Sequence, residues 1–600
     1  MSKDQSFKKK NHPRSQFFRT DPLGDRRLLI VGLRPGRLRT PGERCGVPEG
    51  YKLQILKNGL LVSIRPACRI DFLEAQIFAT PQTTPKNGRF SGPQLLHHGL
   101  GGSHSLQSEN KKNLKVAIIG GGLAGMSAAR ILQEKSVDYV LFEGTDRVGG
   151  RVRPTEYKNG YLQMGAEFIN GKMNPMYEIA THLKIVDRYM DDEELFTDDC
   201  IYACGKSEIS KKDIAEFQSF TAPLSDKFEE AGKSEVTPSV AEMFYAEYEG
   251  WLQQDEQRFA RRRIFDRLAK MYQTFYENEW SAPFDQLAVL NLDRWDDFSD
   301  AFASFTLGPY GFKAILDEIK SHVNEKNIRF NSIVQNIDYS GSKVRLTIAS
   351  GGEPQLFDYV IVTCPIGHLK RFSFSLFTPP LPKLKQQAID SLGMGNMMKV
   401  FLEYETEWWP EEVGSILALP ETTNNNNSIS NFNYNNNKEN VKPMDWKQIK
   451  ELERRRKIKE TLRVFQPLEW ESNLLVCWLA GDGPKLISQV DDQALAELVT
   501  ERLRESLVDQ TIPLPKSLKR MDWYSHPLFH GSYSFITPEA AAMGDPYAIM
   551  GEPVTNAASK KPQLLFAGEA THTNLYQTTS GAYLSGQREA ERICKLEGLI

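Results

Sequence analysis

The stretch that decides the fold runs from Lys115 to Arg151 and reads KVAIIGGGLAGMSAARILQEKSVDYVLFEGTDRVGGR. Val116 to Ile119 form a short apolar run, which is typical of a buried parallel strand. Three glycines then follow as G-x-G-x-x-G, namely Gly120, Gly122 and Gly125. The first permits a tight turn, the second lets the backbone approach a pyrophosphate, and the third lets the next helix pack closely on the strand. This order predicts the start of a Rossmann-like domain.

The residues after the glycines complete a dinucleotide-binding pattern. A helix is expected from about Leu123 to Glu134, with its positive N-terminal end facing the phosphates. A second strand, Tyr139 to Phe142, ends at Glu143, about 20 residues after the first glycine, where a carboxylate can hold ribose hydroxyls. A glycine-rich turn without a ligand would leave this acid unexplained. The stretch therefore predicts a dinucleotide site.

A second pair of glycines follows the ribose acid. Gly149 and Gly150 precede Arg151 in the string RVGGR. Two glycines and a cation at this place suit a second approach to the same diphosphate, although an ordinary polar turn would have the same composition.

The other half of the site is expected near the end of the chain, from Leu564 to Arg588, which reads LLFAGEATHTNLYQTTSGAYLSGQR. Leu564 to Ala567 predict another buried strand. Thr578 and Thr579 offer hydroxyls, and a helix from Ala582 to Leu596 can present its positive end to the same ligand. The cofactor domain must therefore be discontinuous in sequence.

These strings, together with the GAEF of Gly165 to Phe168, resemble the flavin-containing amine oxidase family, and within it the animal polyamine oxidases that act on spermine and N1-acetylpolyamines. The resemblance runs from about Asn113 to about Cys594 and is interrupted by one insert. It implies that the dinucleotide is FAD and that Glu569, in GEATH, belongs to the FAD-binding motif. In the family a valine meets the adenine end through its backbone; Val334 is the matching residue, and plain core packing is the alternative.

The expected fold class is α/β plus α+β. A Rossmann-like, discontinuous FAD-binding domain is assigned to residues 113–190, 306–370 and 540–600. A substrate domain of mixed sheet and helices is inserted into it and takes residues 191–305 and 371–539.

Two segments are expected to lie outside both domains. Residues 1–112 are basic and show little periodicity, so we expect a disordered, solvated extension with a possible hairpin from Tyr51 to Pro66. An insert at about 422–460 begins with an Asn-rich stretch that cannot bury a core, and a charged helix from Asp445 to Lys459 follows it. The whole chain carries a net charge of −3. Because residues 1–112 are basic, residues 113–600 must carry a larger negative charge, which suits a cationic substrate and solubility equally well.

Lys399 is the candidate catalytic residue. It lies in GMGNMMKVFLEY, just before an apolar strand from Val400 to Tyr404. A lysine at the start of a strand is usually a solvated edge charge. In the family, however, the matching lysine hydrogen-bonds a water beside flavin N5, so the resemblance implies that Lys399 assists flavin reduction, reoxidation by O2, or both.

The resemblance also suggests residues that contact substrate. Glu279 and Ser281, in YENEWSA, match the family's ammonium contact, while Tyr533 and Tyr576 are aromatic candidates for the substrate wall, with core packing as the alternative for Tyr576. Asn170 stands where the vertebrate polyamine oxidases carry a histidine. An asparagine can hydrogen-bond an amine but cannot titrate. The substrate preference and the pH profile are therefore the properties of the family that are least safely carried over to this chain.

The FAD is expected to be noncovalent. In the monoamine oxidases a cysteine in the corresponding loop bonds to the flavin, whereas this chain has Ser532, whose hydroxyl cannot form a thioether. No metal site is expected, because nothing completes a ligand set around the close pair Cys200 and Cys204.

The predicted function is that of an FAD-dependent polyamine oxidase. Hydride passes from a polyamine C–H to flavin N5, the imine is hydrolysed to an aminoaldehyde and a shorter amine, and O2 is reduced to H2O2. A histone lysine demethylase, a monoamine oxidase and a catalytically silent flavin-binding scaffold are the alternatives. The expected partners are the polyamine and O2, without nucleic acid or membrane, and the oligomeric state is open. The absence of an S-K-L ending and of a run of about 18 apolar residues favours the cytoplasm.

Overall fold

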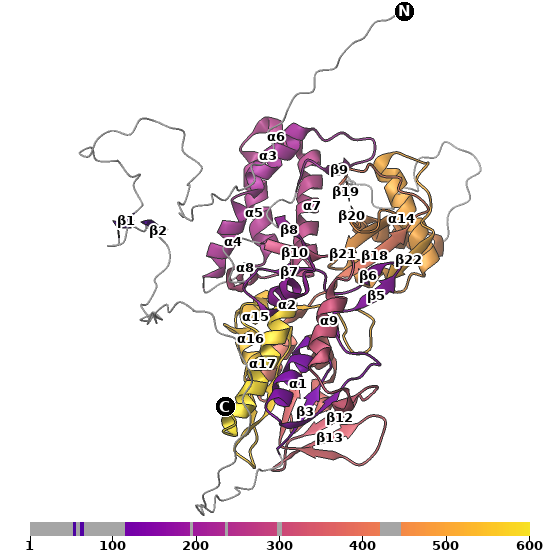
Figure 1. Ribbon diagram of the computed structural model, residues 1–600. Coiled ribbons are helices and arrows are strands. Elements are labelled where there is room, and N and C mark those ends of the chain that lie inside the picture. Colours follow the sequence, from indigo (N-terminus) through magenta and orange to yellow (C-terminus); the bar gives the residue numbers. More distant parts are fainter. Residues whose placement is uncertain are drawn as a thin grey trace, which may run out of the picture. The chain divides into compact units, whose positions relative to one another are not determined.

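The computed structural model describes residues 52–55, 61–64, 114–191, 196–234, 238–296, 303–420 and 446–600. The chain divides into two compact units, 1–105 and 106–600. In the first unit, β1 (Lys52–Ile55) and β2 (Leu61–Ile64) pair antiparallel, which is the hairpin expected there. The rest of the basic extension and the Asn-rich stretch of the insert lie outside the described residues. All other elements belong to the second unit (Figure 1).

A six-stranded sheet with the order β11-β4-β3-β15-β25-β24 forms the base of the second unit. Its strands come from three separate parts of the chain: β3 (Lys115–Ile119), β4 (Asp138–Phe142), β11 (Ile328–Arg329), β15 (Tyr359–Val362), β24 (Val554–Thr555) and β25 (Pro562–Phe566). All pairs are parallel except β24 with β25. Ile119, Val362 and Phe566 lie in register, so the carboxyl ends of three strands meet at one edge.

Helices cover one face of this sheet. They are α1 (Leu123–Glu134), α2 (Pro175–Leu183), α9 (Phe312–Ser321) and α17 (Thr579–Leu596). α1 and α17 lie side by side although they come from opposite ends of the unit (Figure 1). Gly586 permits this contact, because a Cβ there would stand 2.0 Å from the carbonyl oxygen of Ala124.

The other face is covered by an antiparallel layer and further helices, which share one apolar core with β3, β15 and β25. The small sheet has the order β14-β13-β12-β16. Its elements and the helices are β12 (Val334–Asp338), β13 (Val344–Ile348), β14 (Gln355–Phe357), β16 (Phe377–Thr378), α10 (Ile366–Leu376), α11 (Lys383–Ser391), α15 (Pro538–Ala541) and α16 (Pro546–Gly551).

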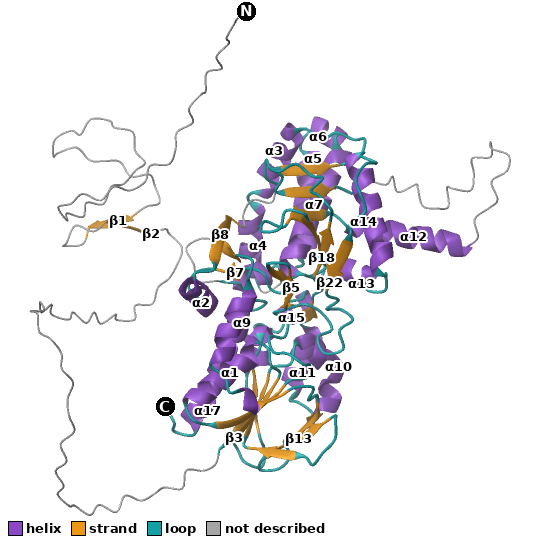
Figure 2. Ribbon diagram, turned by 45° about the vertical axis from the view of Figure 1, so that its right-hand side comes forward, coloured by secondary structure: helices purple, strands orange, loops and turns teal. Residues whose placement is uncertain are grey.

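A second six-stranded sheet, with the order β22-β18-β21-β20-β19-β9, organises the other half of the unit (Figure 2). Its strands are β9 (Cys200–Ala203), β18 (Met398–Glu403), β19 (Ser415–Ala418), β20 (Val464–Pro467), β21 (Leu474–Leu479) and β22 (Ser517–Arg520). β18 is an inner strand with neighbours on both sides, so Lys399 is not the edge charge that a strand start would suggest.

Alternate residues of this sheet face two different helical layers. Leu417 and Val464 belong to one apolar cluster with α3 (Lys211–Thr221), α4 (Leu224–Gly232), α5 (Val240–Gln253), α7 (Arg262–Trp280) and α8 (Leu290–Arg294). The short helix α6 (Glu256–Ala260) lies between α5 and α7 in the sequence. Ile416 and Phe465 face α12 (Trp446–Thr461), α13 (Gly483–Ile487) and α14 (Asp492–Leu507). α12 is the charged helix expected after the Asn-rich stretch.

Short sheets join the two halves. They are the three-stranded β7 (Ile169–Asn170), β10 (Ala303–Leu307) and β8 (Val186–Asp191), and the pairs β5 (Pro154–Tyr157) with β6 (Gly160–Gln163) and β17 (Gly393–Met394) with β23 (Ser534–Phe535). Within the described part of the chain, no helix has the length and apolar character needed to span a bilayer.

Candidate active site

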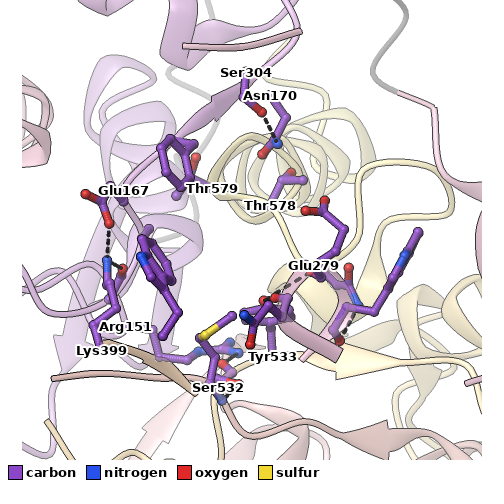
Figure 3. A pocket seen from close by; sticks show the side chains of 18 of the residues that line it. Arg151, Glu167, Asn170, Glu279, Ser304, Lys399, Ser532, Tyr533, Thr578 and Thr579 are labelled. Atoms are coloured by element: carbon purple, nitrogen blue, oxygen red, sulfur yellow. Dashed lines mark hydrogen bonds and ion pairs between the residues drawn. The ribbon is translucent and has the colours of Figure 1, made fainter. Parts of the chain in front are cut away.

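A cavity of about 1970 Å³ is lined by residues of both large sheets and their helices. Pockets for a single small ligand are usually about 300–1,000 Å³. The volume therefore leaves room for a dinucleotide and a second molecule. The glycine loop after β3 forms part of the wall. Lys399 and Glu279 lie at other parts of it (Figure 3).

The first glycine loop has the shape that a diphosphate requires. Gly120 has a φ of +108°, a conformation that L side chains rarely adopt. A Cβ on Gly125 would stand 1.9 Å from the carbonyl oxygen of Gly120, so the helix can approach the loop only with glycine there. Gly122 caps α1 without a side-chain hydrogen bond, and Leu123 and the glycines before it line the cavity. The free N–H groups of this helix end can therefore meet an anion.

Glu143 follows β4 and lies on the cavity wall. Its Oε2 accepts a 2.6 Å hydrogen bond from the Gly121 N–H, and its Oε1 accepts bonds of 2.7 Å from the N–H and the hydroxyl of Thr145. Each carboxylate oxygen has two acceptor positions. These bonds use both positions on Oε1 and one on Oε2. Glu143 can therefore shape the glycine loop and still accept one ribose hydroxyl through Oε2.

The second glycine pair packs on the first loop. The Gly149 N–H donates a 2.8 Å hydrogen bond to the Gly121 carbonyl, and Gly149 has a φ of +106°. A Cβ on Gly150 would lie 3.2 Å from Cα of Gly122. Both glycines line the cavity. They bring a second stretch of backbone to the place where the first loop would hold the diphosphate.

Arg151 and Glu569 link the two remote motifs. Arg151 Nη1 lies 2.9 Å from Glu569 Oε1 and donates a 2.6 Å hydrogen bond to the Ser532 carbonyl. Glu569 Oε2 accepts hydrogen bonds from the Ser534 hydroxyl at 2.6 Å and from the Gln577 N–H at 3.2 Å. The Glu569 carboxylate is only 5% exposed. This acid therefore joins the chain segments around the cavity, and Ser534 and Gln577 are partners that the sequence did not reveal.

The remaining predicted cofactor residues also reach the cavity wall. Thr578 caps α17, because its hydroxyl accepts a 2.9 Å hydrogen bond from the Gly581 N–H, and Thr579 is the first residue of that helix. The helix thus begins three residues earlier than Ala582, the start expected from sequence. Val334, the first residue of β12, lines the cavity and is buried.

Lys399 lies on the cavity wall with its side chain 3% exposed. Its Nζ donates a 2.7 Å hydrogen bond to the Gly165 carbonyl and lies 2.6 Å from Glu167 Oε2 (Figure 3). The ammonium also stands 5.2 Å from the ring centroid of Trp478. Burial lowers the pKa of Lys399, and the Glu167 carboxylate opposes that shift. Glu167 lies in the GAEF string, but the sequence did not predict a role for it in the site.

Three of the predicted substrate residues share the cavity. Asn170 Nδ2 donates a 3.2 Å hydrogen bond to the Ser304 hydroxyl across the β7–β10 pair. The Tyr533 hydroxyl donates to the Glu279 carbonyl at 3.2 Å, and burial raises the pKa of Tyr533. These three residues and Ser304 line the cavity, and Glu279 lies on the side opposite Lys399 (Figure 3).

Ser281 and Tyr576 do not lie on this wall. Ser281 is fully buried at the end of α7 with a left-handed φ of 51°, and it accepts a 3.2 Å hydrogen bond from the Ser532 hydroxyl. Tyr576 is fully buried, stacks on Tyr547 at 4.4 Å, and donates its hydroxyl to the Asn291 carbonyl. Core packing, the alternative for Tyr576, describes its position. Neither residue belongs to the cavity lining.

Ser532 lines the cavity where the sequence placed a potential attachment point for flavin. Its hydroxyl accepts a 2.9 Å hydrogen bond from the Met397 N–H. Since a hydroxyl forms no thioether, acid precipitation is expected to release all bound flavin into the supernatant, as measured by its visible absorbance. Flavin that stays with the denatured pellet would contradict this prediction.

Within the described residues, no group of three or more His, Cys, Asp and Glu side chains could hold a metal ion. The wall instead combines glycine loops, two helix N-termini and an acid after β4, which suit FAD. The model of the family of flavin-containing amine oxidoreductases matches residues 123–594. The chain belongs to this family and is an oxidoreductase with FAD as cofactor, and the predicted α/β plus α+β fold class is confirmed.

Individual relatives share only about a quarter of their aligned residues with this chain. The peroxisomal N1-acetyl-spermine/spermidine oxidase of Homo sapiens is 26% identical over 513 residues, which cover 80% of this chain and 95% of that protein. The probable polyamine oxidase 5 of Arabidopsis thaliana is 26% identical and covers 81% and 98%. The lysine-specific histone demethylase 2 of Homo sapiens is 25% identical, with 82% of this chain but 55% of that protein covered. A solved putrescine oxidase bound to putrescine shares the fold, with a TM-score of 0.55 at 16% identity over 80% of this chain and 99% of that one.

Proposed function

We propose that this protein is a polyamine oxidase, which converts a polyamine to an aminoaldehyde and a shorter amine and forms H2O2 from O2. The observation that carries the proposal is the charge of the cavity wall. Ten carboxylates and three cations line it. Each cation is paired with a carboxylate of the same wall: Arg151 with Glu569, Arg188 with Glu469, and Lys399 with Glu167. The wall therefore keeps an excess of negative charge, which attracts a polycation.

The acidic side chains away from the glycine loops are placed to hold the remote ammonium groups of such a substrate. Asp226 and Glu229 lie on the same side of α4, and Glu279 extends from the end of α7. All three line the cavity. Burial and the neighbouring Asp226 raise the pKa of Glu229, which is the effect expected where like charges are crowded without a bound cation.

The protein groups then have separate tasks. The carboxylates orient the chain of the polyamine, and the aromatic side chains of Phe168, Trp478 and Tyr533 form an apolar wall that excludes water from the reacting carbon. When bound, the flavin supplies the hydride acceptor and passes the electrons on to O2. Lys399 provides a fixed donor on the wall. The imine left on the substrate is hydrolysed by water.

The test is a peroxide assay on the flavin-loaded protein with spermine, spermidine, N1-acetylspermine, tyramine and a methyl-lysine peptide. We expect turnover with at least one polyamine and a kcat/KM that falls as salt screens the wall. Turnover of tyramine or of the peptide alone would instead support a monoamine oxidase or a demethylase. A flavin-loaded protein inactive on every amine would support a silent scaffold.

A matched variant tests the role of the wall. Asp226→Asn with Glu229→Gln is expected to raise KM for the polyamine by about tenfold at pH 8, since roughly 1.4 kcal/mol of lost binding is a factor of ten. The effect should shrink as the pH falls below the raised pKa of Glu229, because the native carboxyl is then also neutral. The flavin absorbance should not change. An unchanged KM at pH 8 would remove the support that these two acids give to the proposal.

A further inference from the structure

The position of Lys399 poses an electrostatic problem. Along β18, Lys399 and Phe401 face the same side of the sheet, where Phe401 belongs to a buried apolar cluster with Met164 and Val476. Lys399 is itself 4% exposed as a residue. A buried ammonium without a counter-charge is strongly unfavourable. The fold must therefore supply a partner at this point.

That partner is Glu167. Its Oε2 lies 2.6 Å from Lys399 Nζ, and the Gly165 carbonyl from the same segment accepts a second hydrogen bond at 2.7 Å. The aromatic ring on the remaining side, that of Trp478, carries no charge. Among the described residues, no second acid lies within ion-pair distance of Lys399.

The other charged groups around the pair are farther away. Glu469, which follows β20, acts electrostatically on Glu167 and is itself paired with Arg188 of β8. Glu403 and Lys519 lie on the same face of the sheet but further along β18 and β22 than Lys399. The charge state of Lys399 therefore depends first on Glu167.

The pair also lies on the cavity wall. The Glu167 side chain is 19% exposed and lines the cavity, whereas that of Lys399 is 3% exposed. The positive charge of Lys399 and the negative charge of Glu167 therefore sum to zero at this point of the cavity wall. If Glu167 were neutral, the wall would present an uncompensated cation in a low-dielectric environment, where repulsion of a substrate ammonium is strong.

We propose that Glu167 is a positioning residue that fixes Lys399 Nζ at the wall as half of a neutral ion pair, so that a polycationic substrate can approach the reacting centre. This inference rests on the proposed function for its substrate, but the ion pair can be measured without turnover. Glu167 acts through Lys399 and sets which charge the cavity presents at this point.

The direct test labels lysine in the flavin-loaded protein with acetic anhydride across a pH series and quantifies acetylated Lys399 by peptide mass spectrometry. Only the neutral amine reacts, so the midpoint reports the pKa. In Glu167→Gln the midpoint should fall by at least about one unit, because the carboxylate that opposes the burial effect is gone. Glu469→Gln, which removes the next acid but not the pair, should move the midpoint much less. Equal midpoints in Glu167→Gln and the native protein would overturn the proposal.

Kinetics supply the second test. Glu167→Gln should raise KM for a triamine by about tenfold or more, with a smaller rise for a monoamine, and the defect should vanish as the pH rises through the pKa of Lys399 and the lone amine becomes neutral. In a double-mutant cycle, Glu167→Gln should add little to Lys399→Met, since both act through one ammonium. Additive losses, or a defect independent of pH, would mean a merely structural role.

The two tests separate this inference from the proposed function. If no amine is oxidised but the labelling midpoint shifts, the role of Glu167 in the ion pair is supported and the proposed polyamine oxidase function is contradicted. If polyamines are oxidised and the midpoint is unchanged, the function stands and the role of Glu167 is refuted. Thermal unfolding of each variant with its flavin establishes that the fold is retained.

Discussion

Replacing Lys399 with methionine is expected to lower kcat by about 10²–10⁴-fold, the usual effect of removing a group that handles a proton at a reacting centre. The side chain is almost fully buried, and its Nζ is held by the Gly165 carbonyl and Glu167. Methionine keeps the length and the apolar contacts with Trp478 but removes the donor. Anaerobic mixing with substrate and subsequent mixing with O2 would show whether flavin reduction or reoxidation is slowed.

Lys385 is the matched control for this prediction. It is also buried, donates hydrogen bonds of 2.7 and 2.8 Å to the carbonyls of Ile549 and Met550, and does not belong to the cavity lining. Burial lowers the pKa of Lys385 to about 7. Lys385→Met should therefore alter the melting temperature but leave kcat within about twofold. Similar losses of kcat in both variants would show that Lys399 acts through stability alone.

Replacing Gly125 with alanine is expected to yield protein with little or no bound flavin. The added Cβ would stand 1.9 Å from the carbonyl oxygen of Gly120, and a backbone atom cannot rotate away as a side chain would. Either α1 moves off the sheet or the turn after β3 opens. Either change disrupts the loop that faces the diphosphate, and overpacking of this kind costs about 1–3 kcal/mol or more. Flavin absorbance per protein and the FAD dissociation constant measure the result.

Gly250 provides the comparison for this substitution. It lies inside α5, and an added Cβ would meet nothing within 4 Å. Gly250→Ala should keep the full flavin content and stabilise the protein by about 0.5–1 kcal/mol, because alanine favours a helix. A Gly125→Ala protein that is as yellow and as stable as Gly250→Ala would refute the steric argument.

The elements that depend on local sequence were predicted well. The helix expected from Leu123 to Glu134 has those bounds. Its apolar face and the glycine at its start both depend on residues that are close together in the sequence, so they could be recognised without the structure. The start of α17 was placed at Ala582, three residues too late. Thr578 was available as the signal, since a threonine three residues before Gly581 is a common N-cap, but its hydroxyl was assigned to the flavin alone.

The site was predicted less completely, because sequence spacing does not show which way a side chain points across a tertiary contact. Glu279 and Ser281 are two residues apart, yet one lines the cavity while the other is buried behind it, where α7 ends in a left-handed turn. Glu167 was missed for the same reason. Its importance arises from Lys399, a residue of another sheet that meets it only after folding.

The contact between α1 and α17 has a consequence for how the holoenzyme is made. β25 lies beside β15 in the sheet, Thr578 and Thr579 at the start of α17 line the cavity wall, and Gly586 of α17 packs against α1. A chain still on the ribosome that has not yet released residues 562–596 therefore has half a cradle and an open sheet edge. We therefore expect the full FAD site to form only after that last segment has been synthesised.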